Sequence, residues 1–288
     1  MYQIIELNDD NISSYETYLG YDVSENLDRT YYRGLVAQNE DDVTVAAIVY
    51  VLKNLDSGSK DTLSNIVWAR CDDTEAFGAL MEKYTDCVKA LGVKTSKVTL
   101  PAKNGKELRA LFRNAGFEMG IDESDIVTVR VSELSAMPFM QKLKKVKLPD
   151  SIMVLNEITM RPFKRALAKC VSRGIYGLCD DLEELPVAYF EDDVSCISVS
   201  NGEINGLFLF HKRPSGVMAI QLLICLDSSF KTTIPHMMRR FVTAMEEKYG
   251  PDALVELDRH NEQSLLLSEK LLPRGLGMPI YSGDRSEV

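Results

Sequence analysis

The segment with the clearest chemical potential is a polar loop that leads into a long amphipathic stretch. Residues 227–236 read DSSFKTTIPH. The first N–H groups of a helix have no partners within it and its N-terminus is partially positive, so such a start can bind phosphate. Ser, Thr and Pro are also ordinary helix-start residues, which leaves plain capping equally open. The candidates for phosphate contact are Lys231, Thr232, Thr233, Ile234 and His236.

His211 is the candidate general base, because imidazole titrates near neutral pH. It stands at the end of an expected strand, and a single imidazole without a visible partner fits a packing role as well. Gly-rich phosphate loops and a G-x-S-x-G elbow are absent from the sequence. Their absence argues against P-loop, dinucleotide-binding and serine hydrolase chemistry.

The elements that must position these residues occur twice. Residues 63–118 and residues 217–275 both predict a strand, a long amphipathic helix, a second strand and a second helix. Aligning Phe112 with Ser268 (268 − 112 = 156) also aligns the second strands of the two copies. A repeat of this length predicts two related domains.

Turn residues predict hairpins and the domain boundary. The pair Asn201-Gly202 tolerates the positive φ angles of a tight hairpin. Residues 132–150 contain charges and two prolines without a sustained period. We therefore expect domains at 1–135 and 151–288, joined by a linker at 136–150. The predicted fold class is mixed α/β, with a mostly antiparallel sheet flanked by helices in each domain.

This tandem order resembles the GNAT-type acyl-CoA N-acyltransferase fold. In that family a loop of pattern Q/R-x-x-G-x-G/A opens the long helix and binds pyrophosphate. A later helix, N-x-x-A-x-x-L-Y-x-K-x-G-F, supplies a tyrosine that protonates the departing thiolate. The first copy has three carboxylates in residues 70–78 (RCDDTEAFG), and Phe112 at the tyrosine position. Acids at a helix start stabilise the helix but repel phosphate, so we interpret this half as non-catalytic.

The second copy keeps more of the pattern. Residues 261–270 (NEQSLLLSEK) retain Asn261, and Ser268 replaces the tyrosine. A serine hydroxyl is a poor direct acid, although it can hydrogen-bond a sulfur or relay a proton through water. The resemblance also implies that backbone N–H groups polarise the thioester carbonyl. These would lie at Ile224, Cys225 and Leu226.

The end of the chain departs from the family. Two strands usually follow the last helix, whereas only Met278–Ser282 is strand-like here. We therefore expect the second sheet to be a strand short, or to take a strand from the first half.

The resemblance implies an N-acetyltransferase with its site in the C-terminal half, where an amine attacks acyl-CoA directly. Acetyl-CoA or another acyl-CoA would be the cosubstrate, without a metal, and the acceptor a small-molecule or peptide amine. Ser268 and His211 are the catalytic candidates. A tandem that has lost catalysis and acts as a binding or scaffold module is the alternative, followed by an unrelated α/β protein. The sequence predicts neither the acceptor nor the oligomeric state.

Composition restricts the classes of binding partner and the cellular compartment that we expect. With 43 acidic and 33 basic residues, the net charge of −10 argues against nucleic acid or an anionic membrane as the main partner. The six cysteines have no metal-ligand spacing, and neither a signal peptide nor a long apolar segment is recognisable. We therefore expect a cytoplasmic protein with reduced thiols.

Overall fold

The chain forms two compact units, which a computed structural model describes for residues 2–28, 32–54, 62–122, 126–177, 179, 182–227, 230–259, 265–266, 268 and 280–288. Unit 1 comprises Met1–Val127, Arg213–Gly216 and Met278–Val288, and unit 2 comprises Thr128–Lys212 and Val217–Gly277. Each unit has one mostly antiparallel sheet with helices on its faces, which confirms the predicted α/β class.

Unit 1 has a seven-stranded sheet in the order β1-β2-β3-β4-β5-β13-β6. Its strands are β1 (Gln3–Leu7), β2 (Arg33–Gln38), β3 (Thr44–Asn54), β4 (Thr62–Cys71), β5 (Thr95–Pro101), β6 (Glu118–Asp122) and β13 (Ile280–Ser286). Its helices are η1 (Ile12–Tyr15), α1 (Glu16–Leu19), α2 (Tyr21–Asp28), α3 (Thr74–Ala90) and α4 (Ala102–Asn114).

Apolar side chains bury both faces of this sheet. One core cluster joins the sheet to α3 and α4, where Phe77 and Phe112 pack edge to face with ring centroids 5.4 Å apart. The other cluster joins the opposite face to α1 and α2 and includes Val67 of β4. The helical spacing of apolar residues in α3 predicted its buried face correctly.

Unit 2 has a six-stranded sheet in the order β7-β12-β11-β10-β9-β8. Its strands are β7 (Ile126–Arg130), β8 (Ile152–Val154), β9 (Cys196–Ser200), β10 (Glu203–Lys212), β11 (Met218–Cys225) and β12 (Leu254–Asp258). Its helices are α5 (Val131–Ala136), α6 (Pro138–Leu143), η2 (Leu155–Glu157), α7 (Met160–Val171), η3 (Val187–Tyr189) and α8 (Phe230–Tyr249).

Helices α7 and α8 bury opposite faces of this sheet. A core cluster gathers α7 and the segment after it against β9, β10 and β11. On the other face Phe241 of α8 stacks on Phe210 of β10 at 3.8 Å. Asn201 and Gly202 have φ angles of 52° and 77°, which confirms the predicted β9–β10 hairpin.

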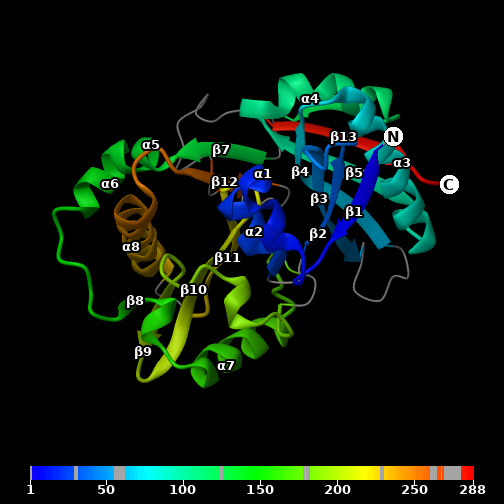
Figure 1. Cartoon of the computed structure of the whole chain (residues 1–288). Coiled ribbons are helices and arrows are strands. Elements are labelled where there is room, and N and C mark those ends of the chain that lie inside the picture. Colours follow the sequence, from blue (N-terminus) through cyan, green and yellow to red (C-terminus); the bar gives the residue numbers. More distant parts are fainter. Residues whose placement is uncertain are drawn as a thin grey trace. The chain divides into compact units, whose positions relative to one another are not determined.

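Two strands lie in the sheet of the other half of the sequence. β13, from the end of the chain, pairs antiparallel with both β5 and β6 and is drawn red within the sheet of blue β1 (Figure 1). β7, which follows β6 in the sequence, lies beside β12 in the second sheet. Of the two alternatives that we expected, a second sheet one strand short or one that takes a strand from the first half, the structure has the second.

Helix α7 begins at Met160 and has Pro162 in its first turn, where a proline is tolerated because the N–H groups there lack acceptors. Residues 136–150, the expected linker, contain helix α6.

Candidate functional site

In both units two neighbouring parallel strands separate at the start of the long helix. In unit 1, β4 pairs with β5 only from Leu63 to Ile66, although β4 continues to Cys71. In unit 2, β11 pairs with β12 only at Met218 and Ala219, although β11 continues to Cys225. Among the described residues, nothing pairs with that edge of either strand just before the long helix.

A β-bulge marks the same position in each diverging strand. Between β3 and β4 the register skips Val67, and between β10 and β11 it skips Gln221. Val67 is buried in the apolar core beneath α1 and α2. Gln221 is the one side chain of β11 that carries an amide, and it is only 6% exposed. Bulges redirect side chains and often lie next to active sites. The sequence analysis missed Gln221, although an amide within the apolar run MAIQLLIC was a usable signal.

In unit 1 a carboxylate occupies the helix start. Asp73 Oδ1 accepts hydrogen bonds from the N–H groups of Glu75 and Ala76 at 2.9 and 3.1 Å, and Oδ2 accepts from Tyr2 Oη at 2.9 Å. The Ala76 N–H and the Tyr2 hydroxyl hold the pKa of Asp73 below its usual value. The predicted capping role is confirmed, and these two N–H groups of α3 are engaged. Phe112 is fully buried in the core.

In unit 2 the residues predicted to contact phosphate occupy the first turns of α8. Lys231 and Thr232 are exposed, Thr233 is buried, and Ile234 and His236 are half-buried. Burial, and secondarily Arg239, lowers the pKa of His236, which keeps this ring neutral at pH 7. Ser228 and Ser229 lie outside the described residues.

Backbone N–H groups at the end of β11 point alternately towards the two edges of the strand. Leu226 N–H donates to Asn205 O of unit 2 at 2.6 Å. Because N–H groups alternate between the two edges of a strand, that of Ile224 also points towards β10. The N–H of Cys225 points to the edge from which β12 has diverged. Among the three predicted N–H groups, Cys225 is thus the one directed into the divergence.

His211 belongs to a buried polar cluster around Gln221. His211 Nδ1 lies 2.7 Å from Tyr189 O, and the two rings stack with centroids 4.1 Å apart. Gln221 Oε1 accepts from Tyr189 Oη and Cys179 Sγ, both at 3.4 Å. Gly177, with φ +63°, brings the backbone against the bulge, where a Cβ atom would lie 2.3 Å from Gln221 O. The predicted base therefore has partners that the sequence did not reveal.

The remaining catalytic candidate is buried. Ser268 is 1% exposed, and its hydroxyl donates to Leu265 O at 2.8 Å. In this arrangement the hydroxyl hydrogen of Ser268 is engaged by the Leu265 carbonyl oxygen. Asn261, predicted to contact the cofactor, lies outside the described residues.

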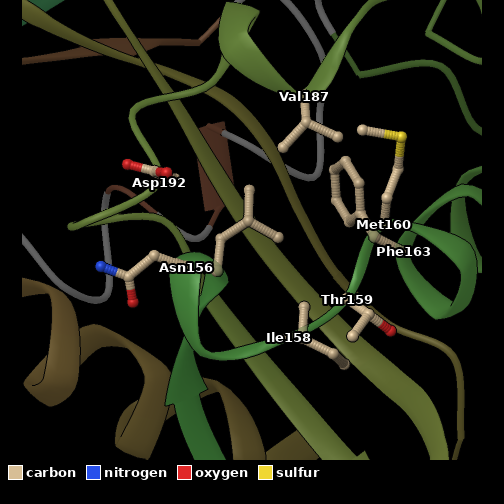
Figure 2. A pocket seen from close by; sticks show the side chains of 8 residues that line it. Asn156, Ile158, Thr159, Met160, Phe163, Val187 and Asp192 are labelled. Carbon is tan, nitrogen blue, oxygen red and sulfur yellow. The ribbon is translucent and has the colours of Figure 1, made fainter.

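A pocket of about 210 Å³ opens on unit 2 at the start of α7. Figure 2 shows Asp192 and Asn156 on one side of it and Val187, Met160 and Phe163 on the other. Phe163 packs edge to face on Phe190 at 5.8 Å. Phe190 packs in the same way on Tyr189 at 5.2 Å, so one chain of aromatic contacts connects the pocket wall to the His211 cluster.

Metal sites and membrane-spanning helices are not found among the described residues. Within the part of the chain that the structure describes, no group of three or more His, Cys, Asp or Glu side chains is arranged to hold a metal ion. Among the same residues, every helix is too short or too polar to cross a lipid bilayer. All six cysteines are described, and none of them forms a disulfide bond.

Comparison with known proteins identifies the fold. No family model and no curated protein matches the sequence. A tandem GNAT protein from the clavulanic acid biosynthesis pathway is 9% identical, with a TM-score of 0.59 over 100% of this chain and 99% of that protein. A GCN5-related N-acetyltransferase from Sphaerobacter thermophilus is 11% identical, with a TM-score of 0.54 over 99% and 96%. The chain therefore has the tandem GNAT fold, which confirms the resemblance seen in the sequence.

Proposed function

We propose that this chain, with its tandem GNAT fold, is an acyl-CoA-dependent N-acyltransferase whose working site lies in unit 2. The observation that carries the proposal is the divergence of β11 from β12 beside the bulge at Gln221, directly before the N-terminus of α8. An unpaired strand edge offers backbone groups to an extended ligand, and a helix start offers charge stabilisation to a phosphate. Acetyl-CoA is the simplest cosubstrate.

Differences between the units support unit 2 over unit 1. At the start of α3 the carboxylate of Asp73 accepts from two N–H groups that a pyrophosphate would need, and its charge would repel the anion. At the start of α8 the side chains of Lys231 and Thr232, a cation and a hydroxyl, are exposed. At the bulges, unit 1 has the apolar Val67 and unit 2 the amide of Gln221.

The proposed reaction is a direct transfer. The neutral amine nitrogen attacks the carbonyl carbon of the thioester, the C–S bond breaks, and CoA leaves as a thiolate that takes up a proton. The products are an amide and free CoA. The Cys225 N–H would donate to the carbonyl oxygen as negative charge develops on it, which is the role of an oxyanion hole.

His211 would accept the proton that the amine loses through intervening water, because it is 1% exposed and pairs with Ala219, six residues before Cys225 on β11 or about 20 Å along the strand. Its Nδ1 lies at hydrogen-bond distance from Tyr189 O, and a carbonyl only accepts, so Nδ1 carries a hydrogen. The neutral ring then has Nε2 as its basic nitrogen. Stacking on Tyr189 fixes the plane of the imidazole.

One observation favours a second candidate, a binding or scaffold protein without catalysis. Ser268 stands at the position of the family's acidic tyrosine, and its hydroxyl is buried and bonded to Leu265 O. With that arrangement the thiolate would have to be protonated by another group or by water. Turnover distinguishes the two candidates.

Calorimetric titration of the intact chain with acetyl-CoA tests cosubstrate binding. We expect one site per chain and about tenfold weaker binding for Lys231→Ala, the loss typical of one hydrogen bond to a charged group. Asp73→Ala, at the corresponding helix start in unit 1, is the matched control and should leave the affinity unchanged. Absence of binding, or equal affinity of the Lys231 variant and the native chain, would refute the unit 2 site.

A panel of primary amines then tests catalysis by release of free CoA. We expect His211→Gln to lower kcat by about 10²- to 10⁴-fold at pH 7, as for loss of a general base. Acetyl-CoA binding without turnover of any amine would favour the scaffold candidate.

A further inference from the structure

The pocket beside α7 has an apolar floor and a separate polar edge. Leu155 and Phe163 are almost completely buried and form the floor, and Ile158, Met160 and Val187 complete the apolar lining. Met160 is 63% exposed at the rim. Apolar surface of this kind stabilises a ligand that carries a short hydrocarbon chain.

The polar edge consists of hydrogen-bond acceptors. Asn156 Nδ2 donates to Asp193 Oδ1 at 2.5 Å, which leaves the amide oxygen of Asn156 as an acceptor. The Asp192 carboxylate is exposed and makes no side-chain hydrogen bond or ion pair with a described residue. A carboxylate and an amide oxygen suit a group that only donates, and an ammonium has three donors and no acceptor.

Backbone hydrogen bonds make this edge rigid. Asn156 N–H donates to Asp192 O at 3.1 Å, and Leu155 N–H donates to Ser195 O at 2.8 Å. Asp193 is held in turn by Lys248. The backbone at Asp192 and the side-chain amide of Asn156 are therefore positioned before any ligand arrives, which reduces the entropy cost of binding.

The segment that carries Asp192 is strongly acidic, and its neighbouring cations Lys164 and Lys248 are already engaged. Residues 183–193 (EELPVAYFEDD) contain five carboxylates and no lysine or arginine. Lys248 pairs with Glu191 and Asp193, and the Asp192 charge remains for an incoming cation. An anionic ligand would be repelled there.

We infer that this pocket binds a small primary ammonium with an apolar chain, its charge at Asp192 and its chain over Phe163 and Val187. The role of this ligand rests on the proposed function, in which it would be the amine acceptor or the part of an acceptor that carries the apolar tail. Aromatic contacts from Phe163 through Phe190 to Tyr189 connect the pocket wall to the His211 cluster.

The first experiment measures binding by the full-length chain without CoA. Hexylammonium, hexan-1-ol and hexanoate share one apolar chain and differ in charge, and each is titrated while amide NMR shifts are followed. We expect hexylammonium to bind about two- to fivefold tighter than hexanol, the range of an exposed ion pair, and hexanoate to bind most weakly. Equal affinities for the three would overturn the inference.

Two variants locate the site. Asp192→Asn should remove the preference for hexylammonium over hexanol, while Asp252→Asn, an exposed carboxylate of unit 2 that does not line the pocket, should keep it. Val187→Ser should weaken binding of all three probes, because it removes apolar contact from a half-buried position. An unchanged preference in Asp192→Asn, or unchanged affinities in Val187→Ser, would contradict the assignment.

A kinetic experiment separates this inference from the proposed function. If hexylamine is acetylated, Asp192→Asn should raise its KM by about two- to fivefold and leave kcat unchanged. Acetylation with an unchanged KM overturns the pocket as the acceptor site while the acyltransferase stands. Selective ammonium binding without acetylation of any amine supports the pocket and refutes the acyltransferase.

Discussion

Replacing Gly177 by alanine should destabilise unit 2 much more than the same change at Gly174. Both glycines have positive φ, +63° and +71°, so a side chain at either costs about 1–2 kcal/mol in backbone strain. A Cβ at Gly177 would also lie 2.3 Å from Gln221 O, whereas a Cβ at Gly174 meets no atom within 4 Å.

The contact of a Cβ at Gly177 with Gln221 O determines how much more stability Gly177→Ala loses than Gly174→Ala. Gln221 O belongs to the backbone of a bulge within the sheet, so it must shift together with β11. Forcing an extra carbon into packed structure costs about 1–3 kcal/mol. We therefore expect a loss in the free energy of unfolding of about 2–5 kcal/mol for Gly177→Ala, and about 1–2 kcal/mol for Gly174→Ala.

Urea unfolding followed by hydrogen exchange of unit 2 peptides measures this difference. Peptide-level exchange is needed because a chain with two units need not unfold in one step. With an m-value of about 2 kcal/mol/M, the midpoints of the two variants should differ by about 0.5–1.5 M urea. Equal shifts of the two variants, or a larger shift for Gly174→Ala, would refute the close approach of this segment to the bulge.

Three further predictions concern other buried or charged groups. Arg285→Ala should lower the stability of unit 1 by about 3–5 kcal/mol in urea unfolding, because Glu287, whose side chain is 1% exposed, loses its cation; Glu287→Ala in the same background should then cost little more. Tyr84→Phe should cost about 1–3 kcal/mol, since two buried serine hydroxyls lose their shared partner; a neutral result would disprove that bridge. Hydrogen bonding from Lys248 lowers the pKa of Asp193 in the folded protein. The pair therefore stabilises unit 2 at pH values above the unfolded pKa of about 3.9, and this stabilisation is lost as pH falls through the lower folded pKa. Lys248→Met should therefore raise the NMR-titrated pKa of Asp193 and destabilise the protein at pH 7 more than at pH 2.

The sequence alone determined the types of most elements and their order. Periodicity of apolar residues reports whether a segment buries one face as a helix or a strand, and it does so locally. The Asn201-Gly202 hairpin and the Asp73 cap followed in the same way, because φ preference and side-chain capping act within a few residues. The duplicated order was sufficient to predict the tandem fold.

Only the tertiary structure decided which distant residues meet. Whether β13 pairs with strands of its own half or with β5 and β6 depends on non-local hydrogen bonds that leave no mark on the periodicity of residues 280–286. The meeting of Gly177 with Gln221, and of Asp192 with the apolar lining from α7, has the same origin. Local preference selects an element, whereas pairing partners and pockets are selected by burial and hydrogen bonding summed over segments far apart in the chain.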